Sequence, residues 1–232
     1  MPVMTEGLKE AVRLLVTLDP EVMEITLRTI QVSGTGTFIS VLIGIPTGAF
    51  LALKTFFGRG FLVSLVNFGM GLPPVVVGLA TWLTLTRYGP LGMLNLLYSP
   101  TAMIIAQAII ASPIVAGLTL AAIQSVNPKL KLQIIALGAN RIQYLLLLLW
   151  EARLGILSAV IAGFGGVISE VGASMMVGGN VRGYTRVLTT ATVLEVSKGK
   201  FELACALSII LLILTFTIMW VLSYLQQRGK NP

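Results

Sequence analysis

Residues 88–128 read YGPLGMLNLLYSPTAMIIAQAIIASPIVAGLTLAAIQSVNP and contain no charged side chain. A charge at the centre of a bilayer costs at least about 2.5 kcal/mol, so a charge-free stretch of this length is typical of a membrane span. Turn signals at Gly89-Pro90 and Ser99-Pro100 place the helix itself at about 101–123.

Four further charge-free windows lie on either side of this stretch. They cover residues 29–53, 60–86, 154–169 and 203–227. Because a spanning helix needs about 20 residues, each window predicts one more span, and the chain is predicted to be an all-α membrane protein. The five predicted spans are about 25–53, 61–86, 101–123, 148–169 and 203–225.

The composition agrees with a membrane protein. Of 232 residues, 56% are hydrophobic and 11% are charged, and the mean hydropathy is +0.92. Soluble domains carry about 25% charged residues, so many apolar side chains here must face lipid. The net charge is +7, but no basic run is present, and nucleic acid is not an expected partner. With no histidine and one cysteine, Cys205, the sequence excludes histidine-based catalysis and an intrachain disulfide.

The first 20 residues are predicted to form an amphipathic helix that lies in the membrane interface. The apolar face of residues 6–18 carries Leu8, Ala11, Val12, Leu15 and Leu18. Asp19-Pro20-Glu21 then predicts the start of the first spanning helix, because it offers an N-cap, a first-turn proline and a first-turn acid. The transmembrane domain is expected at 21–228.

Helix-breaking residues occur inside three of the predicted spans. Gly44 and Gly48 form a small-xxx-small pair around Pro46, which favours close packing between helices. The other interruptions are Gly69, Gly71, Pro73 and Pro74 in the second span and Ser112-Pro113 in the third. Broken helices at membrane depth must face protein or a water-filled cavity, so several of them favour a translocation path over a passive anchor.

Residues 124–145 are the most polar stretch between two spans. Asn127-Pro128 predicts the start of a short helix, Gly138 its end in the left-handed conformation, and Asn140 the cap of a second helix. An interfacial helix with snorkelling lysines fits the same spacing, and the spacing alone leaves both interpretations open.

The run ALGANR at 136–141 resembles the core of the EAA loop of ABC importer permeases. The resemblance implies a cytoplasmic loop of coupling helices that docks on an ATP-hydrolysing subunit. The coupling residues that it implies are Leu137, Gly138, Ala139, Asn140 and Arg141. The match is partial: the E-A-A triplet would fall on Leu132, Gln133 and Ile134, and the later Leu-Pro on Trp150 and Glu151.

A second resemblance covers SEVGASMMVGGNVRGYTR at 169–186. It is similar to the E-x-G-A-x-x-M-x-x-G-N pattern of molybdate, sulfate and tungstate importer permeases. The Thr189-Thr190-Ala191 run with Glu195, and MGLPPVVVG at 70–78, resemble tungstate permeases most. The similarity covers about 5–225. It implies the five-helix fold of type I ABC importer permeases and a subunit that carries tungstate, with molybdate or sulfate as alternatives.

Residues 169–200 are the expected extracytoplasmic gate segment. A tetrahedral oxyanion accepts hydrogen bonds, so it suits backbone N–H groups, hydroxyls and arginine. The candidate path and gate residues are Glu170, Gly172, Ser174, Met175, Met176, Gly178, Gly179, Asn180 and Arg182. Three alternatives stay open. Glu170 is a proton carrier or a structural acceptor, the methionines form a dewetting gate or simple packing, and Arg182 contacts the anion, solvent or a binding protein.

Lysines and arginines fall almost equally on both sides of the predicted topology, so they do not decide its orientation. The resemblance places the coupling loop in the cytoplasm, the N-terminus outside and the C-terminus inside a prokaryotic cytoplasmic membrane. It implies a homodimer, two ABC ATPase subunits and an extracytoplasmic oxyanion-binding protein.

The sequence predicts a transport subunit and not an enzyme. It has no GxxxxGK[ST] loop, so ATP and Mg are expected on the ATPase, and neither a cofactor nor a metal is expected on this chain. The alternative is a proton-coupled anion carrier that uses Glu170.

Overall fold

The computed structural model describes residues 2–228, which form eleven α-helices and one 3-10 helix without any strand. The helices are α1 (Pro2–Val16), α2 (Pro20–Leu53), α3 (Arg59–Met70), α4 (Pro74–Leu85), η1 (Gly92–Leu94), α5 (Pro100–Gln124), α6 (Pro128–Ala136), α7 (Arg141–Glu151), α8 (Arg153–Ile168), α9 (Gly172–Gly178), α10 (Leu188–Ser197) and α11 (Phe201–Arg228).

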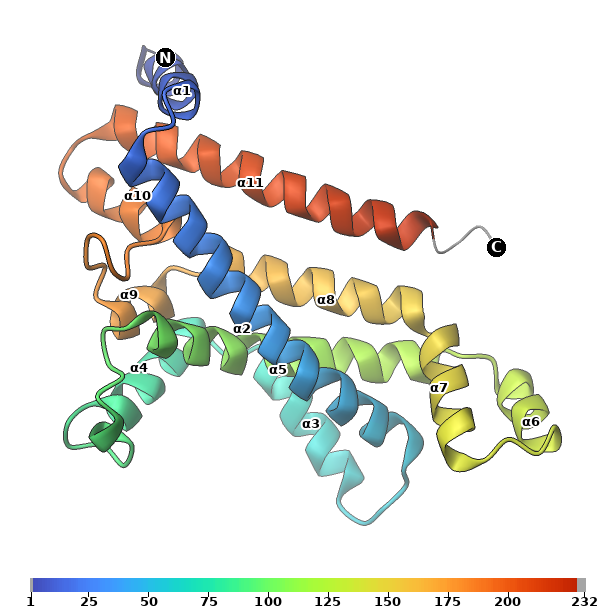
Figure 1. The fold of residues 1–232 in the computed structure, drawn as a ribbon. Coiled ribbons are helices and arrows are strands. Elements are labelled where there is room, and N and C mark those ends of the chain that lie inside the picture. Colours follow the sequence, from blue (N-terminus) through green and yellow to red (C-terminus); the bar gives the residue numbers. More distant parts are fainter. Residues whose placement is uncertain (1, 229–232) are drawn as a thin grey trace.

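Three helices are long and apolar enough to cross a membrane alone, namely α2, α5 and α11. The pairs α3–α4 and α7–α8 pass the same test together, so the structure agrees with five spans when each bent pair counts as one. In Figure 1 the chain passes back and forth between two ends of the molecule. One end holds α1 and α10, and the other holds α6, α7 and the last turn of α11.

The second span differs from the straight helix predicted at 61–86. Helices α3 and α4 meet at an angle of 100°. The break falls at Gly71, Leu72 and Pro73, where Pro73 and Pro74 lack the N–H groups that would continue the helical hydrogen bonds. The sequence marked the interruption, but it did not give the size of the bend.

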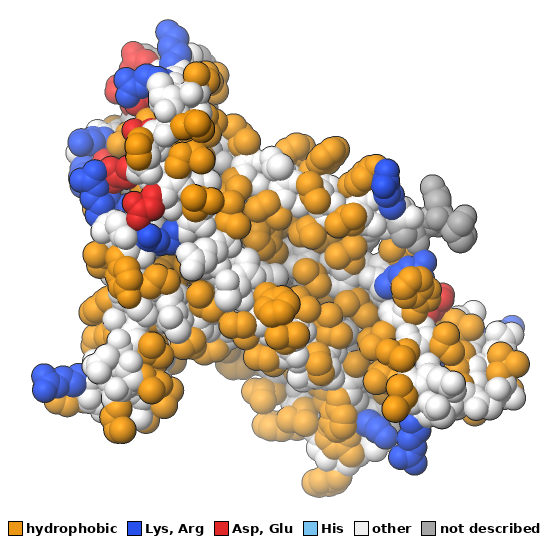
Figure 2. Space-filling view, viewed as in Figure 1, with side chains coloured by type: hydrophobic (Ala, Val, Ile, Leu, Met, Phe, Trp, Pro, Cys, Tyr) orange, Lys and Arg blue, Asp and Glu red, His pale blue; other side chains and the backbone are white. Residues whose placement is uncertain are grey.

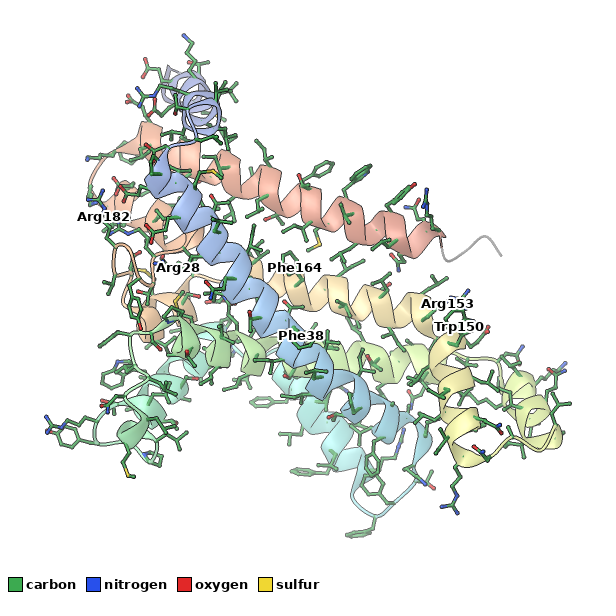
Figure 3. All side chains as sticks on the ribbon, viewed as in Figure 1. Arg28, Phe38, Trp150, Arg153, Phe164 and Arg182 are labelled. Carbon is green, nitrogen blue, oxygen red and sulfur yellow. The ribbon has the colours of Figure 1, made fainter. Side chains whose placement is uncertain are left out.

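The predicted fourth span, 148–169, is a bent pair of helices and not one straight helix. Helix α7 ends at Glu151, and α8 begins at Arg153 after a bend of 66°. At the bend, Arg153 donates to the Trp150 carbonyl oxygen at 3.0 Å, and its guanidinium lies 4.6 Å from the centre of the Trp150 ring. Figure 3 shows both side chains at the junction of α7 and α8. Trp150 and Glu151 therefore belong to α7, on the other side of the bend from α8.

Helices α2 and α5 form the centre of the fold, and close backbone contact holds them together. A Cβ atom added at Gly44 would lie 2.7 Å from Val115 Cβ, and one added at Gly48 would collide with the Ala116 carbonyl oxygen. This confirms the predicted packing role of the small-xxx-small pair. The interruption predicted at Ser112-Pro113 is wrong, because α5 continues through Pro113.

Helix α1 packs on the start of α11. The buried face of α1 consists of Gly7, Ala11 and Leu14. Gly7 allows the backbones of α1 and α11 to approach closely, since a Cβ atom there would lie 2.5 Å from Cys205 Cβ. The predicted single apolar face is therefore split. Leu8, Val12 and Leu18 are exposed, whereas Ala11 is buried and Leu15 packs at the edge of the α1–α11 core. The interfacial location of α1 stays a prediction.

Candidate coupling hairpin and gate segment

The hairpin formed by α6 and α7 has the helix–turn–helix shape that the sequence predicts. Asn127 begins α6, since its Oδ1 accepts from the Lys129 N–H at 2.9 Å. Gly138 ends it with φ of +77°. The N–H groups of Gly138 and Ala139 donate to the carbonyl oxygens of Ile135 (3.0 Å) and Ile134 (3.3 Å), which is a Schellman motif.

Helix α7 begins with a capping box. Asn140 Oδ1 accepts from the N–H groups of Ile142 (3.0 Å) and Gln143 (2.9 Å), and Gln143 Oε1 accepts from the Asn140 N–H at 2.9 Å. Both ends of the turn are therefore fixed by local hydrogen bonds. All five predicted coupling residues, 137–141, lie in or next to this turn.

The outer surface of the hairpin is apolar. Leu137 at its tip is 87% exposed, and Leu132, Ile135 and Ile142 are also exposed. Exposed apolar clusters of this kind mark interaction sites. Of the three positions that match the E-A-A triplet, Leu132 and Gln133 face outward, whereas Ile134 is buried against the end of α5.

The predicted gate segment contains two short helices, α9 and α10, that the sequence did not predict. Helix α9 packs against α4 and α5. A Cβ at Gly78 on α4 would lie 2.7 Å from the Ala173 Cα, and one at Gly178 would lie 2.7 Å from Met103 Sδ. Gly178 is therefore buried, and it serves close packing in this structure.

Glu170 lies between α8 and α9 and is hydrogen-bonded to α9 and α10. Its Oε1 accepts from the Ala173 N–H at 2.8 Å, and its carbonyl oxygen accepts from Thr189 Oγ1 at 3.2 Å. This arrangement agrees with the second alternative for Glu170, a structural acceptor whose carboxylate binds neighbouring backbone. Gly172 lies within the same turn, and the half-buried Met175 and Met176 lie on α9 beyond it.

Gln107 is a buried polar residue at the gate that the sequence analysis missed. It lies in the middle of α5, and its Nε2 donates to the Val167 carbonyl oxygen at 3.3 Å and to Ser174 Oγ at 3.4 Å. Within the described chain its Oε1 is buried without a hydrogen-bond partner. The sequence did contain a signal for this residue, because Gln107 is the one glutamine within the predicted span 101–123.

The loop after α9 closes on itself. Gly179 and Asn180 have φ of +68° and +51°, and the Gly179 N–H donates to the Met175 carbonyl oxygen at 3.0 Å. Thr185 Oγ1 donates to the Gly178 carbonyl oxygen at 2.6 Å. In this conformation the Gly179 N–H is therefore engaged within the loop. Asn180 Nδ2 donates to Thr190 at 3.2 Å.

Three basic residues of the gate segment are paired with acids. Arg182 and Arg186 both bind Glu21 at the start of α2, Arg186 at 3.3 Å. The buried Glu195 binds Lys198 at 2.7 Å. These side chains line a cavity of about 440 Å³ at the end of the molecule that holds α1, where Figure 3 shows Arg182. The sequence analysis gave Glu21 only as a first-turn acid and missed its pairing here, since its partners lie more than 160 positions away.

Comparison with known proteins agrees with this architecture. Residues 44–231 match the family described as "Binding-protein-dependent transport system inner membrane component". The chain is 38% identical over 98% of its length to the whole tungstate uptake system permease protein TupB of Peptoclostridium acidaminophilum. It is 32% identical over 93% of its length to TupB of Campylobacter jejuni, covering 90% of that protein.

Among solved structures, the MetNI methionine ABC transporter in an inward-facing conformation shares the fold. The TM-score is 0.76 at 19% identity, over 92% of this chain and 98% of that one. The chain belongs to the family of inner-membrane permease components of binding-protein-dependent ABC transport systems.

Proposed function

We propose that this permease carries tungstate into the cytoplasm as the membrane subunit of an ATP-driven importer. The α6–α7 hairpin carries the proposal, because it presents an exposed apolar tip, Leu137, on a turn fixed by a Schellman motif and a capping box. The choice of tungstate is supported by the two tungstate uptake permeases, which align with nearly the whole chain. Molybdate is the close alternative.

The proposed assembly contains two copies of this chain, two ATPase subunits and an extracytoplasmic binding protein. ATP and Mg would bind the ATPase subunits, and this chain would need no cofactor. The hairpin and the end of α11 lie at one end of the molecule, and α1 lies at the other. Docking of the hairpin on a cytoplasmic ATPase would therefore put the C-terminus inside and the N-terminus outside.

The path from hairpin to gate is short and continuous. Helix α7 joins α8 through a single residue, Ala152, and α8 leads directly to Glu170 and α9. A displacement of the hairpin would move the end of α8, where Gln107 on α5 binds both Val167 and Ser174. Alternating access would then open and close the path at Met175 and Met176.

The anion contacts themselves are proposed to form in another state of the cycle. In this conformation Arg182 is bound to Glu21, so it must leave that partner before it can bind an oxyanion. Ser174 and Asn180, the other polar candidates, are also hydrogen-bonded in this conformation, to Gln107 and to the Thr190 carbonyl oxygen.

The test is uptake of radiolabelled tungstate into proteoliposomes that hold this chain, its ATPase and its binding protein. We expect uptake to need ATP and to persist when the proton gradient is collapsed. Unlabelled tungstate should compete better than molybdate, and sulfate should compete least. Better competition by molybdate would reassign the substrate, and loss of uptake with the proton gradient would favour the carrier mechanism.

A further inference from the structure

An apolar groove runs between the last turns of α2 and the face of α7, on the flank of the molecule beside the hairpin. Its volume is about 750 Å³, within the range of about 300–1,000 Å³ of pockets that take small ligands. Its apolar walls are Ile45, Pro46, Ala49, Phe50 and Leu53 from the α2 side and Ile135, Ala139, Ile142, Tyr144, Leu145 and Leu149 from the α6–α7 side.

Two cations complete the lining of the groove, Lys54 at the end of α2 and Arg141 at the start of α7. Within residues 2–228, neither side chain has an ion-pair or hydrogen-bond partner. None of the described residues that line the groove is an acid. Figure 2 shows this part of the surface as mostly hydrophobic, with Lys or Arg side chains along its lower edge. The groove therefore combines a long apolar wall with unneutralised positive charge at one end.

The groove lies where a bilayer meets water. Lys54 directly follows the charge-free window 29–53, so it marks the level at which the first span leaves the hydrocarbon. At the far end of α7, the exposed Trp150 stacks with Arg153, and tryptophans with nearby arginines gather at membrane interfaces. The apolar wall would then face acyl chains, while Lys54 and Arg141 would sit at the level of the headgroups.

We propose that this groove binds an anionic phospholipid of the leaflet on the hairpin side, with its acyl chain along α2 and α7 and its phosphate between Lys54 and Arg141. Basic pockets between spanning helices bind such headgroups. The charge favours this occupant, because a phosphodiester neutralises both cations, whereas an apolar segment of a second copy would leave them unpaired. The site is separate from the proposed anion path at α9, but it shares Ala139 and Arg141 with the proposed coupling residues and so lies against the flank of the proposed docking surface.

Native mass spectrometry of the purified chain tests the site. The detergent should contain equal amounts of phosphatidylglycerol and phosphatidylcholine. Each cation near a membrane surface strengthens binding of an anionic lipid roughly fivefold, so we expect phosphatidylglycerol to be retained roughly thirtyfold better. The double variant Lys54→Gln/Arg141→Gln should lose this preference.

The double variant Arg87→Gln/Lys129→Gln is the matched control, because it removes the same charge from two positions that do not line the groove. It should keep the preference. Equal retention of both lipids by the unaltered chain, or equal loss in the two variants, would overturn the site. Displacement of the bound lipid by inorganic phosphate would show that no acyl chain is held. Loss of the lipid on assembly with the ATPase would assign the groove to that protein instead. Either result would also overturn the proposal.

Discussion

Replacing Gly138 with valine should uncouple the permease from its ATPase. Gly138 has φ of +77°, which an L side chain adopts at a cost of about 1–2 kcal/mol. A Cβ there would meet nothing within 4 Å, so the cost comes from the backbone and not from a collision. Strain of this size reduces the population of the observed turn roughly five- to thirtyfold. The Schellman bonds that hold the tip, from Gly138 and Ala139, would weaken with it.

The assay is ATP-dependent tungstate uptake, together with copurification of the ATPase on the tagged permease. Gly138→Asn is the first control, because asparagine tolerates the left-handed conformation and should keep most of the uptake. Gly60→Val is the second, since it adds the same side chain in open space at a position without positive φ. Normal uptake and normal ATPase binding by Gly138→Val would refute the assignment of the turn as the coupling site.

Three further predictions follow from particular contacts. Gly48→Val should lower the unfolding temperature or abolish the yield of folded protein. The control Gly34→Val should change little, because a Cβ atom at Gly34 would have nothing within 4 Å. Equal yields of the two variants would contradict the α2–α5 packing. Glu170→Gln should retain tungstate uptake, because the amide oxygen can still accept from the Ala173 N–H, and complete loss would favour a proton carrier. The Glu6 carboxylate raises the pKa of Glu202, first because it accepts a hydrogen bond from the protonated Glu202 carboxyl and then through its charge, so protonation of Glu202 favours the α1–α11 contact. That contribution is full below the ordinary carboxyl pKa of about 4.3 and is lost as the pH rises through the raised pKa. The protection factors of the α1 amides, which correct for the pH dependence of intrinsic exchange, should therefore fall over this range in the unaltered chain and stay constant in Glu202→Gln.

Local signals in the sequence predicted the hairpin well. Asn127, Gly138 and Asn140 act through hydrogen bonds to residues two to four positions away, so short-range spacing contains the whole arrangement. The predicted spans 25–53, 101–123 and 203–225 likewise fall within about five residues of α2, α5 and α11 at each end, since the cost of burying charge and the turn signals are local properties of the sequence.

The bends and the long-range pairs could not be predicted in the same way. The angle between α3 and α4 depends on how α3 packs on α5 and α4 on α9, which no local pattern contains. The face of α1 was divided because Gly7 approaches α11 and leaves Leu8 outside. The pairing of Glu21 with Arg182 joins the start of α2 to the loop between α9 and α10, and only the folded arrangement brings these distant segments together.

The close contact of α2 and α5 restricts where this molecule can bend. Two helices whose backbones touch at Gly44 and Gly48 cannot slide past each other without a collision, so they should move together as one rigid unit. Flexing would then concentrate at the two bent junctions, the elbows at Gly71–Pro73 and at Ala152. The distance between two spin labels, one on each helix of an elbow, should therefore change during the transport cycle, whereas the distance between one label on α2 and one on α5 should stay constant.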